Sequence, residues 1–153
     1  MLTIVLVEPK IPPNTGTIAR LCAANYLTLH LVGELGFSLD DTHLKRAGLD
    51  YWPEVNYQHF TNTNEYMTKL NRSKAHLFTT KASQSYTDCH YQKEDILVFG
   101  SETTGLSEDH LSTFSDRCRT IPMQNPAIRS LNLSNAVSIV SYEALRQLNL
   151  RVT

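Results

Sequence analysis

The sequence of 153 residues is poor in the features that mark membrane, secreted and metal-binding proteins. Its three cysteines, Cys22, Cys89 and Cys118, fit no metal motif, so we expect reduced thiols and a cytoplasmic location. Its six histidines are scattered and form no ligand pair, so we expect no metal. No apolar run approaches the roughly 20 residues of a membrane span, and the start lacks the basic region of a signal peptide.

Charge of one sign is also missing, because the formal net charge is −1 at neutral pH. A general nucleic-acid binder usually carries a clear basic excess, so any contact with RNA has to depend on a local patch. The length fits one domain spanning residues 1–153, which buries enough surface to fold without disulfides or metals.

Short apolar runs alternate with helical patterns, which indicates an α/β fold. Strands are predicted at 2–7, 27–33, 75–80, 95–100 and 118–123, and helices at 14–26, 61–71, 107–114 and 135–148. We expect Thr61 or Asn62 to cap the second helix and Ser107 the third. This rhythm favours a mostly parallel sheet with helices on both faces.

Polar loops follow four of the predicted strands. They are rich in Gly, Pro, Ser, Thr or Asn and cover residues 8–16, 79–83, 100–105 and 122–132. Each alone is typical of an ordinary turn. Ligands of parallel sheets bind beyond the carboxyl ends of the strands, so four such loops at one edge predict a binding site.

The stretch before the last helix has more polar side chains than a helix start needs. Ser130, Asn132, Ser134 and Asn135 fall within six residues, although one N-cap is enough. We predict that Ser134 or Asn135 caps the helix, while Ser130 and Asn132 face a polar ligand. The alternative is multiple capping around a polar turn.

Three of these segments together resemble the motifs of the SPOUT superfamily of RNA methyltransferases. They are PPNTGTIARLCAA (12–24), LVFGSETTGL (97–106) and IPMQNPAIRSLNLSNAVSIVSYEALRQ (121–147). The short chain and GFSLDDTHLKRAGLDYW (36–52) are similar to the minimal one-domain group that 2′-O-methylates the wobble nucleotide of tRNA. Glu34 departs from the proline common in that group, but it lies outside the motifs.

The resemblance implies several properties that residue patterns alone do not indicate. It implies a deep C-terminal trefoil knot, a homodimer with active sites at the interface, and S-adenosylmethionine bound in the knot loops. It also implies 2′-O-methylation of cytidine or uridine at the first anticodon position, in leucine tRNAs. The expected partner is therefore the tRNA anticodon stem-loop, without a membrane.

The resemblance also assigns cofactor-binding residues: Phe78, Thr79, Gly100, Ser101, Glu102, Ile121, Pro122, Met123, Ser130 and Leu131. Gly100 is expected to let the cofactor approach the backbone, and Gly105 to serve the tight return of the loop. Ile121, Pro122 and Met123 are expected to form the apolar and backbone walls around the adenine. Phe78 could equally be an ordinary core residue.

The catalytic residues assigned in the same way are Asn14, Arg20, Glu102, Ser130 and Asn132. The family is described with this arginine as general base for the ribose hydroxyl. Because an arginine pKa lies above about 12, we expect Arg20 instead to position RNA through a bidentate phosphate contact. A plain surface arginine is the alternative. Asn14 could orient Arg20 or cap its helix, and Glu102 could hold the loop, the cofactor or Arg20.

Three other functions are compatible with parts of the pattern. The first is 2′-O-methylation of another RNA site, and the second is a non-catalytic RNA-binding or assembly factor on the same fold. A degenerate factor should have lost some of the five catalytic residues, which are all present. The third is a hydrolase with Ser130 as nucleophile, which lacks both the Gly-x-Ser-x-Gly turn and a histidine partner.

Overall fold

A six-stranded parallel sheet forms the centre of the computed structural model, which describes residues 1–48 and 51–149. The order is β3-β2-β1-β5-β4-β6, and every strand pair is parallel. The strands are β1 (Thr3–Val7), β2 (Thr28–Val32), β3 (Asn56–Phe60), β4 (Ala75–Phe78), β5 (Ile96–Phe99) and β6 (Cys118–Arg119). The helices are α1 (Pro12–Ala24), α2 (Thr42–Gly48), α3 (Thr63–Lys69), α4 (Glu108–Thr113) and α5 (Leu133–Gln147), with 3-10 turns η1 (Trp52–Glu54) and η2 (Ser115–Arg117).

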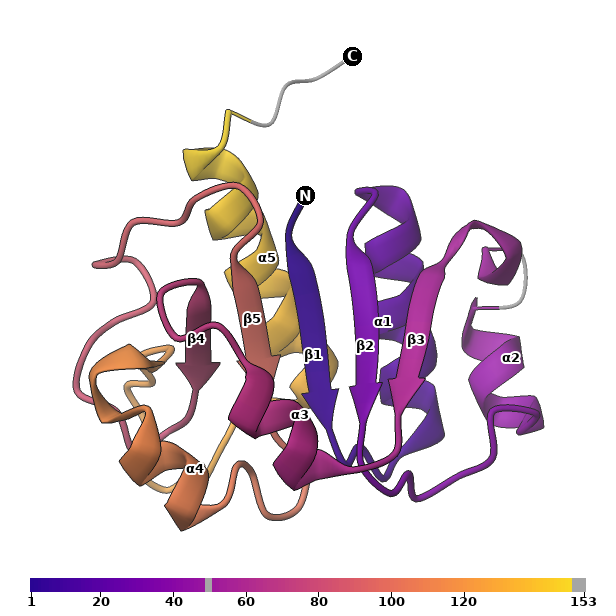
Figure 1. Ribbon diagram of the computed structural model, residues 1–153, viewed down its shortest axis with the longest axis horizontal. Helices are drawn as coiled ribbons and strands as arrows, with labels where there is room; N and C mark the ends of the chain where they lie inside the picture. Colours follow the sequence, from indigo (N-terminus) through magenta and orange to yellow (C-terminus); the bar gives the residue numbers. More distant parts are fainter. Residues whose placement is uncertain (49–50, 150–153) are drawn as a thin grey trace.

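Helices cover both faces of the sheet, as the sequence rhythm predicts. In Figure 1, α1 and α5 lie behind the strands and α3 and α4 in front of them. Successive strand side chains point to opposite faces. In β1, Ile4 and Leu6 therefore pack with α1 and α5, while Val5 and Val7 pack on the side of Met67 from α3.

Helix α2 packs closely against α1. A Cβ placed on Gly16 would lie 2.5 Å from the Cβ of Ala47 and 2.7 Å from the Leu44 carbonyl oxygen. The residue at this position in α1 therefore has to be glycine for α2 to lie where it does. Leu44 of α2 is fully buried, so this helix is packed firmly against the rest of the domain.

Several predicted boundaries are confirmed and others are wrong. Asn62 caps α3 and Ser107 caps α4, each accepting a backbone N–H three residues on. The predicted strand at 118–123 is reduced to β6, because Thr120 makes only an isolated bridge to Ser85 and the chain then turns away. Helix α1 begins at Pro12, two residues earlier than predicted.

Two elements, β3 and α2, have no counterpart in the predicted set. Strand β3 lies at the edge of the sheet, and its first three residues, Asn56–Gln58, are exposed. Such a strand has no apolar run or clean alternation to reveal it. Residues 49 and 50 of the quoted segment 36–52 lie outside the described residues. Among the helices described, none is long and apolar enough to cross a membrane.

Candidate functional site

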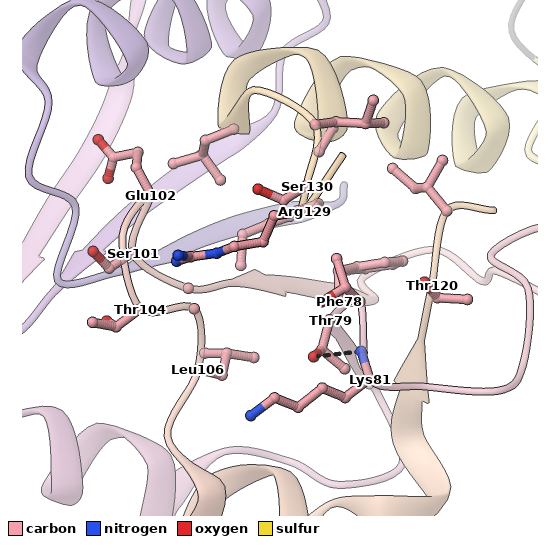
Figure 2. A pocket seen from close by; sticks show the side chains of 18 of the residues that line it. Phe78, Thr79, Lys81, Ser101, Glu102, Thr104, Leu106, Thr120, Arg129 and Ser130 are labelled. Atoms are coloured by element: carbon pink, nitrogen blue, oxygen red, sulfur yellow. Dashed lines mark hydrogen bonds between the residues drawn. The ribbon is translucent and has the colours of Figure 1, made fainter. Parts of the chain in front are cut away.

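A cavity of about 490 Å³ lies at the carboxyl ends of β4, β5 and β6. Its walls are the loops that leave these strands, together with the segment that leads into α5 (Figure 2). This is the edge where the sequence predicts a site. The volume falls within the range of about 300–1,000 Å³ that small-molecule sites occupy.

All the predicted cofactor-binding residues except Pro122 line this cavity. The nine are Phe78, Thr79, Gly100, Ser101, Glu102, Ile121, Met123, Ser130 and Leu131. They come from four separate segments, so the fold brings together what the sequence holds far apart. Pro122 lies between two lining residues but is not itself part of the wall.

Two stacked phenylalanines form part of the apolar wall. The rings of Phe78 and Phe99 lie 4.8 Å apart with an interplanar angle of 14°. Both side chains are buried, and both come from the last positions of paired strands. Phe78 therefore belongs to the core and lines the cavity at the same time, which unites the two interpretations of this residue.

Gly100 is required by the protein chain itself. A Cβ at this position would lie far inside van der Waals contact of the Gly105 carbonyl carbon and the Leu106 nitrogen. The loop from Ser101 to Gly105 folds back on Gly100, with the Gly105 N–H donating to the Ser101 carbonyl at 2.9 Å. A close approach of backbone to backbone is thus a sufficient reason for glycine at this position, and the close approach of the cofactor stays a prediction. Gly105 makes the tight return with a φ of 66°.

The Glu102 side chain binds the loop that connects β1 to α1. Its carboxylate accepts the backbone N–H of Lys10 at 2.9 Å and that of Ile11 at 2.5 Å. In Figure 2 the side chain points away from the middle of the cavity, toward the loop that precedes α1. Of the three partners considered for Glu102, the structure gives the loop, and Arg20 is not bound to it.

Two asparagines link this carboxylate to the start of α5. The Asn14 amide donates to Glu102 at 3.5 Å, and the Asn132 amide donates to the Asn14 side-chain oxygen at 3.0 Å. Asn132 also caps α5, because its side-chain oxygen accepts the Asn135 N–H. The prediction that Ser134 or Asn135 caps this helix is therefore wrong. The hydroxyl of Ser134 instead donates to Asn132, which fixes the capping side chain.

The Arg20 side chain contacts Tyr51 and not this network. Its guanidinium lies 4.6 Å from the centre of the Tyr51 ring and donates to the Tyr51 hydroxyl at 3.1 Å. It does not line the cavity. Asn14 has neither of its two predicted roles, orienting Arg20 or capping the helix. Its side chain bridges Glu102 and Asn132, and the N-cap residue of α1 is Ile11.

Two cationic side chains at the cavity were not among the predicted cofactor residues. Arg129, from the segment before α5, donates to the Thr103 carbonyl oxygen. Figure 2 shows its side chain extending toward the loop that carries Ser101 and Thr104. Lys81 pairs with Glu108 at the start of α4. Their position on strand-exit loops was the only signal in the sequence, and lysine and arginine are common on any surface loop.

The chemistry of the cavity is that of binding and positioning. Its wall combines apolar side chains with hydroxyl groups such as those of Thr79 and Ser130, and it contains no cysteine or histidine. Across residues 1–48 and 51–149, no group of three or more His, Cys, Asp or Glu could hold a metal ion. Burial raises the pKa of the Cys22 thiol to about 12, so this cysteine is an inert core residue at neutral pH.

Comparison with known proteins places these observations in a family. Residues 1–142 match the SpoU rRNA Methylase family. The chain is 47% identical over 148 residues to the tRNA (cytidine(34)-2′-O)-methyltransferase of Methylovorus glucosotrophus, covering 96% of each protein.

Two solved structures have the same architecture over nearly the whole chain. One, described by the words "Structural insights into the 2-OH methylation of C/U34 on tRNA", is 41% identical with a TM-score of 0.92, covering 99% of this chain and 98% of the other. The second is the AdoMet-bound rRNA methyltransferase from Sinorhizobium meliloti, at 25% identity and a TM-score of 0.84, covering 97% of this chain and 57% of the other. By sequence and by fold, this chain belongs to the SpoU rRNA methylase family.

Proposed function

We propose that this protein transfers a methyl group to the ribose 2′-hydroxyl of the wobble nucleotide, cytidine or uridine at position 34, in tRNA. The observation that carries the proposal is the cavity at the ends of β4, β5 and β6, whose wall is built from the segments 97–106 and 121–147 that resemble family motifs, together with the loop after β4. The identity of 47% over nearly the full length of a tRNA (cytidine(34)-2′-O)-methyltransferase supports the choice of substrate.

The cavity fits S-adenosylmethionine as the methyl donor. Phe78, Ile121 and Leu131 offer apolar surface for an adenine, and Thr79 and Ser130 offer hydroxyls for polar groups of the ligand. The Sinorhizobium meliloti structure, which has this fold, contains AdoMet. When bound, this molecule supplies a methyl group on an already activated sulfonium, so the protein needs no nucleophile of its own.

The chain's residues then act by holding the site and the RNA in place. Glu102, Asn14 and Asn132 join the loop after β5, the start of α1 and the start of α5 into one hydrogen-bonded unit. Ser130 lies at the cavity, where it can contact the ribose beside the cofactor. Arg20 is assigned to the RNA backbone, since a guanidinium binds phosphate in bidentate fashion. Correct placement of the hydroxyl in line with the methyl group lowers the barrier by several kcal/mol.

Arg20 and the cavity are brought together in a homodimer. Arg20 does not line the cavity of its own chain, which supports a site that is completed by the Arg20 of a second copy. Helix α5 exposes Ile139 and Tyr142, at 38% and 48%, and Leu131 before the helix is exposed at 37%. Such apolar surface next to the site is suited to a partner chain. Light scattering should show a dimer, and Ile139→Asp should give an inactive monomer.

Other parts of the proposal depend on the resemblance. They are a single domain over residues 1–153, a deep trefoil knot near the C-terminus, leucine tRNAs as acceptors, and a cytoplasmic location. Nucleoside mass spectrometry of individual tRNAs from a strain lacking the protein tests the acceptors. Loss of 2′-O-methylation from a nucleotide other than 34 would overturn the assignment.

The direct test uses a synthetic anticodon stem-loop and labelled S-adenosylmethionine. The purified protein should methylate a stem-loop with cytidine at position 34 and should leave the same stem-loop with 2′-deoxycytidine there unlabelled. Because the two RNAs differ in one oxygen, methylation of both would place the methyl group elsewhere. No transfer to either would contradict the activity itself.

A further inference from the structure

Tyr51 is the partner that the structure gives to Arg20. The ring of Tyr51 carries the guanidinium over its face at 4.6 Å, and its hydroxyl accepts a hydrogen bond from Nη2 at 3.1 Å. The two contacts restrain both the plane and the direction of the guanidinium. Neither a phenylalanine nor a serine at this position could supply both.

The tyrosine is itself held in place by buried neighbours. It immediately precedes η1, whose Trp52 packs against the core behind the sheet and lies 5.0 Å from the Tyr57 ring. The backbone returns to the core at Val55, which is only 8% exposed. Tyr51 is thus presented by a short turn that Trp52 and Val55 anchor on its C-terminal side.

The same contacts leave the arginine able to bind an anion. Among the residues that the structure describes, no carboxylate lies within salt-bridge distance of Arg20, and its only hydrogen-bond acceptor is the neutral Tyr51 hydroxyl. A guanidinium has five N–H donors, so Tyr51 occupies one edge and the others remain available for a fork-like contact with phosphate. An acidic partner would compete with RNA, whereas tyrosine orients the charge without neutralising it.

We propose that Tyr51 is a positioning residue that holds the Arg20 guanidinium in the orientation in which it binds the RNA substrate. This inference depends on the proposed function, in which Arg20 contacts the RNA. Tyr51 acts through Arg20 and makes no contact with the methyl donor. Replacing the Tyr51 side chain should therefore weaken RNA binding and lower kcat/KM for the RNA, and it should leave cofactor binding unchanged.

The test is a double-mutant cycle on methylation of the anticodon stem-loop and on binding of the same RNA. Tyr51→Leu should lower kcat/KM for the RNA about tenfold, since one hydrogen bond and one cation–π contact are lost. Tyr51→Phe, which keeps the ring, should lose only about threefold. In an Arg20→Ala background, Tyr51→Leu should change neither RNA affinity nor turnover further, because the group through which it acts is gone.

Tyr57 provides the matched control. It is as exposed as Tyr51, at 37%, and its ring packs against that of Trp52, the neighbour of Tyr51 in the chain, whereas the contacts of the Arg20 guanidinium are with Tyr51. Tyr57→Leu should leave kcat/KM for the RNA within twofold of the wild type. Calorimetry with S-adenosylhomocysteine and thermal unfolding of each variant measure cofactor affinity and folding separately.

The possible failures are distinguishable. Equal losses from Tyr51→Leu in the wild-type and Arg20→Ala backgrounds would mean that Tyr51 acts independently of Arg20, which overturns the proposal. Unchanged or faster methylation by Tyr51→Leu would overturn it too, since the contact would then hold Arg20 in an orientation that does not help it to bind RNA. If the wild type does not methylate the stem-loop at all, it is the proposed function that fails.

Discussion

The side-chain amide of Asn132 donates to the side-chain oxygen of Asn14 at 3.0 Å, which joins the starts of α5 and α1 across 118 positions of sequence. Asn132 also caps α5, and Asn14 also binds Glu102. One pair of amides therefore connects a helix cap, a second helix and the loop after β5. The polar residues before α5 thus serve the assembly of the site as much as the start of a helix.

Two replacements of Asn132 separate its role as a helix cap from its contact with Asn14. Asn132→Ala should lower the free energy of unfolding by about 2 kcal/mol, because it loses an N-cap of about 1 kcal/mol and a hydrogen bond of similar value. Asn132→Ser keeps a capping hydroxyl but has no amide for Asn14, so we expect about half that loss. Urea unfolding measures both. Equal stability of the two variants would contradict the separate value of the Asn14 contact.

Glu102 is expected to be more important for the site than its surface position suggests. Glu102→Gln replaces one acceptor oxygen by an NH2 group that faces a backbone N–H, at Lys10 or Ile11. Hydrogen bonds to charged acceptors are worth about 1.5–3 kcal/mol, so we expect Glu102→Gln to lower the free energy of unfolding by about 2 kcal/mol. The control is Glu108→Gln, which removes an exposed ion pair with Lys81 and should cost little. Calorimetry with S-adenosylhomocysteine should show weaker binding only for Glu102→Gln.

The sheet was predictable because its buried strands carry their own signal. Ile96–Phe99 and Ala75–Phe78 are short apolar runs, and strands buried on both faces need no other pattern. The exposed edge strand Asn56–Phe60 has no such run, so its pairing with β2 depends on tertiary structure. The location of the site followed from the same logic, since loops at one edge of a parallel sheet meet.

The hydrogen-bond partners of the site residues were far less predictable from the sequence than the segments in which those residues lie. Four polar side chains around the start of α5 could all cap a helix, and the choice of Asn132 depends on where the chain leaves the cavity wall. The partner of Arg20 lies 31 positions away in a segment without regular periodicity. Local sequence restricts which groups are available, whereas the packing of distant segments decides which of them meet.

The carboxylate of Glu143 should make stability depend on pH in the acid range. Hydrogen bonds from Arg146 and Gln147 lower its pKa from the ordinary 4.5 to about 2. A group whose pKa is lower in the folded state stabilises the fold above its unfolded pKa and loses that contribution as the pH falls. Glu143 therefore contributes fully above pH 4.5 and progressively less toward pH 2.

Glu143→Gln should accordingly be less stable than the wild type at pH 6 and closer to it at pH 3, as measured by urea midpoints. Glu65→Gln is the control, because Glu65 accepts one hydrogen bond from the exposed Lys69, while Glu143 accepts three. Its difference from the wild type should be smaller at both pH values. A gap for Glu143→Gln that stays constant between pH 6 and 3 would contradict the lowered pKa.

Gly100 and Gly105 should respond differently to the same substitution. Gly100→Ala forces the Cβ into the backbone of Gly105 and Leu106, so the loop has to move and the cavity wall with it. Gly105→Ala meets no atom within 4 Å and has only the strain of a φ of 66° to overcome, about 1–2 kcal/mol. Thermal unfolding should show a larger loss for Gly100→Ala, and calorimetry should show loss of S-adenosylhomocysteine binding. If Gly100→Ala binds as well as Gly105→Ala, the return of this loop on Gly100 does not shape the cofactor site.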